Sequence, residues 1–520
     1  MILLLDIIDG QNSNKNRFVH FVTFVVIKKR NKSVNTEQIL KNTIQRCKEK
    51  NIILPTYKQM ANPALIPEGI KAELADIGLW DLNPRNLFRI SWQNEPVSKG
   101  GGFGDVNYLE LPTELTGVKA RIIVLIGKFF PTGAHKVGAT FGPLVEKLIS
   151  GQFDPTCQKA LWPSTGNYCR GGAYDGYLLG CPSIAVLPEE MSRERYEWLE
   201  KVGAEIIRTE GGEANVKEIY DKVKQLEDER GDEIVTLNQF GEIGNPLWHY
   251  AVTGRAMEKV FNSISSDEQR FSGMFLTQGS AGTLGSADYL RTKFPKIKVG
   301  AGEALQVPTL LQNGYGAHRI EGIGDKHVPW IHNMKNMDMV IGVDDNISMN
   351  LIRLFNETEG HTLLKAQGID PDLVEKLDYL GISSIANIAG AIKMAKYYEY
   401  NENDVVFTVA TDSMEMYQSR LTELQQEHGD YTEIRAHVDL ERYLLGLDDE
   451  GVMELSYRDK KRMHNLKYFT WVEQQGKTVD ELDAQWYDDN YWSSKFALAD
   501  EWDEKIEAFN AETGLLKKYA

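Results

Sequence analysis

The sequence predicts an α/β protein whose core forms two doubly wound, three-layer αβα sub-domains with a cleft between them. From residue 121 to about residue 425, short apolar runs alternate with segments of helical periodicity, a pattern typical of βαβ units and a largely parallel sheet. The apolar runs are too many for one compact sheet, namely residues 184–187, 205–208, 234–237, 274–277, 298–301, 339–343 and 405–410. Two sub-domains accommodate them, and such sheets bind ligands at the carboxyl ends of their strands.

The remaining segments are extensions of this core. Residues 1–35 share no pattern with the rest of the chain and stay unassigned, whereas residues 36–120 hold a helical segment over 36–49 and a region rich in Pro, Gly and aromatic residues. Residues 426–520 are acidic and aromatic, which predicts a helical wrap against the rest of the chain or a subunit partner. Within the core, we expect a smaller, mobile sub-domain at roughly 133–245 and a larger one at roughly 246–425.

Composition places the chain among globular proteins. Of its 520 residues, 42% are hydrophobic and 26% are charged, close to the globular average, so the chain can bury a large apolar interior. Its formal net charge of −17 argues against binding nucleic acid or an anionic membrane through bulk charge. An anionic ligand therefore needs a local positive site.

Cysteine usage and hydropathy indicate a reducing, cytoplasmic environment without a membrane partner. The four cysteines show no C-x-x-C spacing and no companion histidine pair, so we expect neither a metal site nor a disulfide framework; they are Cys47, Cys157, Cys169 and Cys181. No run of about eighteen apolar residues predicts a spanning helix. The apolar stretches 1–5 and 18–27 lack the features of a secretory signal.

A single lysine stands behind a Pro-Thr-Gly-Ala turn in Lys128-Phe-Phe-Pro-Thr-Gly-Ala-His-Lys136. The motif follows the apolar run 122–126 and precedes a helix-like pattern. A lysine at a helix start is usually a solvated surface group, because lysine is seldom buried. The alternative is a reactive amine, and the other motifs distinguish the two.

Two loops have the features of anion-binding sites. Trp162-Pro-Ser-Thr-Gly-Asn167 opens a helix-like segment, and its hydroxyls, amide and free N–H groups suit a carboxylate or phosphate, although an ordinary N-cap uses the same residue types. Gln278-Gly-Ser-Ala-Gly-Thr-Leu-Gly285 lies between a strand-like run and a helix, where backbone N–H groups form a concave anion site. It lacks the Gly-Lys-Ser/Thr of a Walker loop. Gly100-Gly-Gly-Phe-Gly104 has no such context, and we interpret it as a flexible loop.

The buried strand at 405–410 delivers an acid and a hydroxyl, Asp412 and Ser413, at its carboxyl end. With this piece, the order of the motifs from about residue 130 to 417 resembles the cysteine synthase family, the fold-type II enzymes that use pyridoxal 5'-phosphate. Further matching segments lie at 188–195, 199–211, 238–240, 245–246, 249–250, 316–324 and 381–384. The resemblance implies that the cofactor lies in the cleft between the sub-domains.

The resemblance also implies a role for each matching residue. Lys136 corresponds to the lysine that holds the cofactor as a Schiff base, and Ser413 to the hydroxyl that faces the pyridine nitrogen. Asn167 corresponds to the amide beside the cofactor's ring oxygen, and the substrate site is assigned to Ser164, Thr165, Asn167 and Gln239. The phosphate loop and the turn beside the cofactor are assigned to Gly279, Ser280, Ala281, Gly282, Thr283, Gly322 and Gly324.

The chain departs from cysteine synthases at several positions. Thr-Gly-Ala-His-Lys is closer to the tryptophan synthase β subunit, in which the histidine lies by the phosphate, so we expect His135 beside the phosphate as well. That β subunit carries a carboxylate at the start of the loop matching 164–167, and the absence of an acid there argues against indole chemistry. Ala281 replaces a family glycine, and Tyr168 replaces a small hydroxyl residue, which narrows or reshapes the space for a nucleophile.

These features predict an enzyme that acts at Cβ of an amino acid by elimination through aminoacrylate, as a cysteine synthase-like β-replacement enzyme or a cysteine or serine β-lyase. A hydroxyl rather than a carboxylate at the pyridine nitrogen makes the ring a weaker electron sink and favours elimination. The alternatives are a threonine or serine dehydratase-like ammonia-lyase, a threonine synthase-like enzyme and a catalytically silent scaffold. The family implies a homodimer, and Cys169 is either structural or a redox group.

Overall fold

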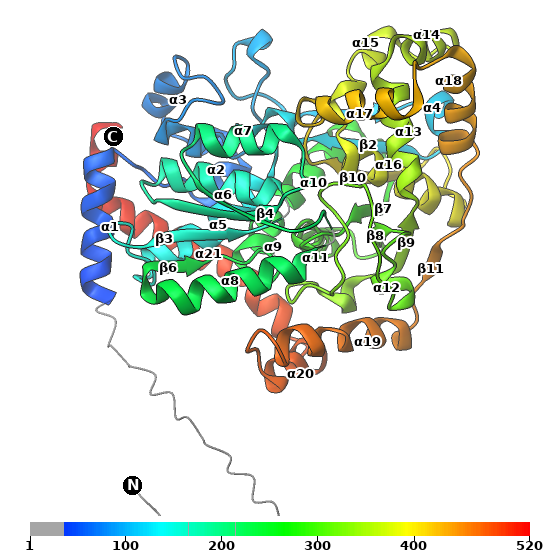
Figure 1. Ribbon diagram of the computed structural model, residues 1–520. Helices are drawn as coiled ribbons and strands as arrows, with labels where there is room; N and C mark the ends of the chain where they lie inside the picture. The colour runs from blue at the N-terminus through cyan, green and yellow to red at the C-terminus, as the bar shows by residue number, and fades with distance from the viewer. Residues whose placement is uncertain (1–35, 165, 214, 520) are drawn as a thin grey trace, which may run out of the picture. The chain divides into compact units, whose positions relative to one another are not determined.

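The computed structural model describes residues 36–164, 166–213 and 215–519, and two β-sheets form within them (Figure 1). The smaller sheet has the strand order β5-β4-β3-β6 and is parallel throughout. Its strands are β3 (Lys159–Pro163), β4 (Ser183–Pro188), β5 (Glu205–Thr209) and β6 (Ile234–Thr236).

The larger sheet has a parallel centre and an antiparallel strand at each edge, in the order β1-β2-β10-β7-β8-β9-β11. Its strands are β1 (Tyr108–Leu111), β2 (Arg121–Ile126), β7 (Arg270–Thr277), β8 (Lys298–Ala304), β9 (Met339–Val343), β10 (Asp404–Ala410) and β11 (Val452–Glu454). β9 and β10 are buried along their whole length, as strands covered by helices on both faces are. The predicted α/β class is therefore confirmed.

Helices connect the parallel strands and cover the sheets (Figure 1). Up to the end of the smaller sheet they are α1 (Thr36–Lys50), α2 (Tyr57–Ala61), α3 (Glu68–Leu74), α4 (Thr113–Thr116), α5 (Lys136–Ile149), α6 (Asn167–Leu178), α7 (Arg193–Lys201) and α8 (Val216–Arg230). Around the larger sheet they are α9 (Gly244–Trp248), α10 (Gly254–Ile264), α11 (Gly285–Lys293), α12 (Thr309–Gln312), α13 (Asp345–Asn356), α14 (Thr358–Ala366), α15 (Pro371–Val374), α16 (Ile382–Tyr397) and α17 (Gln418–His428). The C-terminal segment adds α18 (Glu433–Leu440), α19 (Tyr457–Asn465), α20 (Val479–Tyr487) and α21 (Tyr491–Thr513).

The alternating pattern predicts a core at residues 121–425. Segments outside this predicted core also contribute to the larger sheet. β1 comes from residues before 121 and β11 from residues after 425, and each closes one edge. Both strands are too short to show a hydrophobic period, so the sequence pattern did not reveal them. The sub-domain boundaries stay a prediction, and residues 1–35 lie outside the described part of the chain.

The N- and C-terminal segments hold each other. α21 lies beside α1 (Figure 1), and the Asn510 side chain bonds both the N–H and the carbonyl of Leu54, at 3.1 and 2.8 Å. Asp503 on the same helix accepts a 2.6 Å bond from the Tyr57 N–H. The acidic, aromatic segment therefore packs against its own chain. None of the helices in the described ranges is both long and apolar enough to span a membrane.

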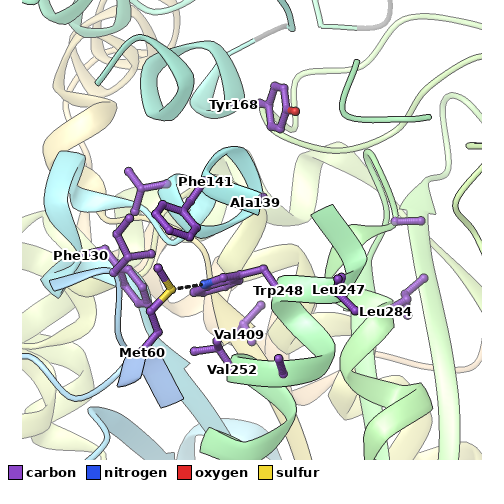
Figure 2. Close-up of a cluster of buried hydrophobic side chains, with 14 of the residues drawn as sticks. Met60, Phe130, Ala139, Phe141, Tyr168, Leu247, Trp248, Val252, Leu284 and Val409 are labelled. Carbon is purple, nitrogen blue, oxygen red and sulfur yellow. Dashed lines mark hydrogen bonds between the residues drawn. The ribbon is translucent and has the colours of Figure 1, made fainter. Parts of the chain in front are cut away.

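Close packing around Trp248 positions helix α5, whose first residue is Lys136. Figure 2 shows the Trp248 indole among apolar side chains that include Phe130, Phe141 and Met60, with its N–H donating to the Met60 sulfur at 3.3 Å. A Cβ added at Gly138 on α5 would lie 2.0 Å from Trp248 Cε2. The absence of a side chain at this position therefore lets helices α5 and α9 approach each other closely.

We expect Gly138→Ala to lower the free energy of unfolding by about 1–3 kcal/mol or more, because the new methyl group overlaps the buried indole. Urea unfolding followed by tryptophan fluorescence measures the change. Gly102→Ala is the matched control, since its Cβ would meet nothing closer than 3.6 Å, and we expect a change within about 0.5 kcal/mol. Equal effects of the two substitutions would contradict the proposed packing constraint.

Candidate active site

A cavity forms where loops from both sheets meet. Most of its lining residues follow the carboxyl ends of strands: Ser164, Gly166, Asn167 and Tyr168 after β3, Gln239 and Phe240 after β6, Gly279 and Ser280 after β7, and Thr411 after β10. Lys136, Glu213, Gly322, Ile323 and Asp325 complete the lining. This is the place at which sheets of this class bind ligands.

Lys136 begins helix α5, and its amine reaches into this cavity. Its Nζ donates to Ser280 Oγ at 3.3 Å. Burial lowers the pKa of Lys136 to about 8, although the carboxylates of Asp325 and Glu213 oppose the shift. An amine with this pKa is partly neutral near pH 7, and the neutral form is the one that attacks a carbonyl.

The glycine-rich loop after β7 lies next to this amine. Ser280 Oγ also accepts hydrogen bonds from Asn245 Nδ2, at 3.1 Å, and from the Gly282 N–H, at 3.3 Å. Ala281 has φ of 62°, a left-handed conformation that suits glycine better than alanine. The loop thus adopts here the backbone that the replaced family glycine would favour. Gly282 and Thr283 begin a short helical turn that leads into α11.

A second glycine turn approaches the first. A Cβ at Gly279 would lie 2.9 Å from the Gly322 carbonyl oxygen, so the two chains touch there. Gly322 and Gly324 have φ of 99° and 74°, which only glycine adopts without strain. The Gly324 N–H donates to the Gln278 carbonyl at 2.8 Å. The structure therefore brings together the two loops that the resemblance assigns to the cofactor.

The loop after β3 forms the opposite side of the cavity. Ser164 Oγ accepts hydrogen bonds from the Gly166 N–H, at 3.1 Å, and from Gln239 Nε2, at 3.2 Å. Thr165 lies outside the described residues. Asn167 lines the cavity, but its side chain is engaged from behind, because Nδ2 donates to Asp412 Oδ2 at 2.5 Å and Oδ1 accepts from Arg170 at 3.2 Å. Its contact with the cofactor stays a prediction.

Two buried polar atoms without a partner among the described residues fit the expected cofactor. One is Ser413 Oγ, which we predict at the pyridine nitrogen, and the other is His135 Nδ1, which we predict near the phosphate. The other ring nitrogen of His135 lies 3.1 Å from Thr411 Oγ1. Burial and the neighbouring Lys136 lower the pKa of His135 to about 3, so the ring is neutral and can donate one hydrogen bond.

Two acidic residues in the cavity have no counterpart in the predictions from sequence. Asp325 and Glu213 are each 5% exposed, and both line the cavity with Lys136. Asp325 directly follows the Gly322–Gly324 turn, and Glu213 follows a pair of glycines after β5. The sequence comparison considers an acid only at the start of the 164–167 loop, whereas these acids enter from other loops. Their position next to glycine turns is the signal that could have identified them.

A buried network of charged side chains supports the 164–167 loop. Arg195 on α7 is completely buried, and it pairs with Glu321 Oε2 at 2.8 Å and donates to the Tyr417 hydroxyl at 3.2 Å. Tyr417 donates to Asp412 Oδ2 at 2.7 Å. A Cβ at Gly166 would lie 2.5 Å from Arg195 Cζ, so the guanidinium lies directly beneath the loop. The network connects α7 to segments of the larger sheet.

Cys169 follows this loop but is not poised for redox chemistry. Its thiol is buried and donates to the Gly166 carbonyl at 2.9 Å. Burial raises the pKa of Cys169 to about 12, so the reactive thiolate is scarce at neutral pH. Of the two alternatives that the sequence leaves open, the structure favours a structural cysteine.

Comparison with known proteins identifies the family. A family model described as "Pyridoxal-phosphate dependent enzyme" matches residues 106–366, about half of the chain. This chain is a member of the pyridoxal-phosphate-dependent enzyme family. The predicted cofactor, pyridoxal 5'-phosphate, is thereby confirmed, and so is the prediction that the chain is an enzyme. The contacts that we assign to the individual site residues stay predictions.

Individual relatives confirm the resemblance to the cysteine synthase family. The chain is 28% identical to cystathionine beta-synthase of Saccharomyces cerevisiae over 323 residues, which are 60% of each protein. It is 31% identical to cysteine synthase of Staphylococcus aureus over 259 residues, 49% of this chain and 74% of that one. A solved cysteine synthase of Entamoeba histolytica shares the fold, with a TM-score of 0.53, 23% identity and coverage of 65% of this chain and 92% of that one. The chain thus spans less than two thirds of the yeast relative's length.

We expect Arg195→Met to lower the free energy of unfolding by about 3–5 kcal/mol, because it leaves the buried Glu321 carboxylate without this partner. The neighbouring Arg193→Met is the matched control. Arg193 is 73% exposed and pairs with Glu197, one turn along the same helix, so its loss should cost about 0.5 kcal/mol or less. Chemical denaturation of both variants measures the difference. Similar losses in the two variants would show that Arg195 does not stabilise the fold through this network.

We expect the apoprotein to form its Schiff base with pyridoxal 5'-phosphate at a rate that rises through pH about 8, rather than near the ordinary lysine value of about 10.4. Borohydride trapping followed by peptide mass spectrometry at each pH measures the rate at Lys136. Lys128 is an internal control: burial favours its neutral form, but the carboxylates of Glu415 and Asp378 outweigh burial and raise its pKa. Trapping at Lys128, or a midpoint near 10, would refute the assignment.

Proposed function

We propose that this enzyme removes or replaces the β-substituent of a small α-amino acid, as a cysteine synthase-like β-replacement enzyme or a cysteine or serine β-lyase. The observation that carries the proposal is the partly neutral Lys136 amine in a cavity bounded by the Ser164–Gln239 pair and by the two glycine turns. The printed names of the relatives, cysteine synthase and cystathionine beta-synthase, support the same chemistry.

The substrate's α-carboxylate is bound, in this proposal, at the loop after β3. Ser164 Oγ and Gln239 Nε2 are 3.2 Å apart, and the first N–H groups of α6 are free of intrahelical partners at this end. A helix N-terminus favours a negative charge by about 0.3–1 kcal/mol. This places Cα of the amino acid between the loop and the Lys136 amine, where Lys136 takes up the α-proton.

Pyridoxal phosphate supplies an electron-withdrawing ring that stabilises negative charge at Cα. In this proposal the protein binds the cofactor and orients it. Main-chain N–H groups of the loop 278–285 suit the phosphate, and Ser413 Oγ, which has no partner among the described residues, suits the pyridine nitrogen. A neutral hydroxyl at that nitrogen does not enforce its protonation, which restrains electron withdrawal and favours loss of a group from Cβ. The homodimer and the cytoplasmic location stay predictions.

Incubation of the purified holoenzyme with L-cysteine, L-serine and O-acetyl-L-serine, with and without added thiol, tests the proposal. Pyruvate and ammonia without added thiol indicate a lyase, and a new β-substituted amino acid in its presence indicates β-replacement. We expect Lys136→Ala to lower kcat by roughly 10²–10⁴-fold through loss of the base. Lys128→Met is the control and should keep activity, because Lys128 pairs with Asp378 and Glu415 outside the cavity.

Other products would favour the alternatives. Formation of 2-oxobutyrate from threonine alone would indicate a dehydratase-like ammonia-lyase. Full occupancy by the cofactor with no turnover of any amino acid would refute the proposal and favour a binding or scaffold role.

A further inference from the structure

The carboxyl group of Asp325 faces the site. Asp325 is 5% exposed and lines the cavity together with Lys136, and its carboxylate makes no hydrogen bond or ion pair within the described part of the chain. The surrounding main chain is fixed, because Gly324 N–H donates to the Gln278 carbonyl at 2.8 Å and Thr309 Oγ1 donates to the Asp325 carbonyl at 2.7 Å. The side chain is therefore held at the cavity wall while its acid group remains available.

The surroundings of Asp325 keep it protonated near neutral pH. Burial and the neighbouring Glu213 carboxylate raise the pKa of Asp325 to about 8, although the Lys136 amine opposes the shift. Tyr220 on α8 also faces this group, and burial raises its own pKa far above neutrality, so it stays uncharged. A protonated carboxyl group and a partly neutral amine thus lie in one cavity, which provides an acid and a base in the same site.

Leaving groups at Cβ differ in their need for such an acid. A carboxylate such as acetate departs as a weak base and requires no proton. A thiolate or a hydroxide is a stronger base, and a positioned acid speeds its departure by roughly 10²–10⁴-fold.

We propose that Asp325 is the catalytic acid that protonates the group leaving Cβ, and that the enzyme therefore acts on amino acids with an unactivated thiol or hydroxyl at Cβ, in addition to those, such as O-acylated serine, whose leaving group needs no proton. This inference rests on the proposed function, because it presupposes elimination at Cβ. It assigns the substrate class that the family alone leaves open.

Lys136 takes up the α-proton, and the electron pair of the Cα–H bond becomes the second bond between Cα and Cβ. The pair of the Cβ–X bond leaves with X, and the Asp325 proton joins it to give HX, which is hydrogen sulfide or water. Hydrolysis of the unsaturated amino acid then yields pyruvate and ammonia, so that cysteine and water give pyruvate, ammonia and hydrogen sulfide. In β-replacement, the Asp325 carboxylate takes the proton of a neutral incoming nucleophile.

The experiment compares wild type and Asp325→Asn on L-cysteine and L-serine against O-acetyl-L-serine and β-chloro-L-alanine, whose leaving groups need no proton. We expect kcat on cysteine and serine to fall roughly 10²–10⁴-fold in the variant, with the other two substrates within a few-fold of wild type. Asp288→Asn is the matched control, since burial also raises the pKa of Asp288, to about 7, but that residue lies outside the cavity.

The pH dependence of turnover is an independent test of Asp325 as the acid. Because the acid must be protonated, wild-type turnover of cysteine should fall as pH rises through about 8, and this alkaline limb should disappear in Asp325→Asn. A second readout needs no turnover. Ionisation of Asp325 beside Lys136 should produce a step near pH 8 in the visible absorbance of the wild-type holoenzyme, and the step should be missing in the variant.

The outcomes separate the two proposals. An equal loss on all four substrates, or no loss on any, would overturn the role of Asp325. Wild-type turnover of O-acetylserine but not of cysteine or serine would overturn the substrate class and leave the proposed function intact. Turnover of none of them would overturn both. Circular dichroism and unfolding midpoints of each variant establish that the compared proteins are folded.

Discussion

A lysine amine whose pKa is lowered to about 8 at the start of a buried helix is the constraint on which the site depends. Two effects act in the same direction at Lys136: burial disfavours the ammonium form, and the positive end of the α5 dipole adds to that penalty. The nearby acids Asp325 and Glu213 offset only part of this penalty, so the position must also be held by other contacts. Close contact of Gly138 with Trp248 and the hydrogen bond from the His135 N–H to the Thr411 carbonyl provide this through packing and main-chain contacts.

The distribution of charge around the amine follows from that constraint. Apart from Lys136, no lysine or arginine lines the described cavity, even though two buried arginines, Arg170 and Arg195, lie just behind the 164–167 loop. Those arginines are engaged by Asn167, Glu321 and their neighbours. For an anionic cofactor in a chain of net charge −17, we therefore expect binding mainly by main-chain N–H groups, whose partial charges are screened little in such a loop. The net charge of the whole chain therefore does not determine whether this loop can bind an anion.

Local features of the chain could be predicted from sequence, and features made by the fold could not. The lysine motif and the loops 164–167 and 278–285 are contiguous stretches, so their residue types alone indicated their use. β1 and β11 escaped prediction because strands of four and three residues show no period. Glu213 and Asp325 escaped because each is a single acid in a glycine-rich turn, where a solvated side chain is the ordinary expectation. They become cavity residues only because their turns meet the loops after β3, β6, β7 and β10.

Main-chain hydrogen bonds shape the loops that we assign to the cofactor, whereas side chains on neighbouring positions set which substrate fits. The hydrogen bonds around Asp325 use the main chain of residues 324 and 325 together with Gln278 and Thr309, so a different side chain at 325 would leave those bonds in place. Tyr168 likewise lines the cavity from the first turn of α6 without contributing to the glycine turns. Side chains at such positions can change which group leaves Cβ without disturbing the cofactor's cradle. Because pocket shape and charge rather than motifs set specificity, the family's name alone is a poor guide to the substrate, and the acid beside Gly324 is a better one.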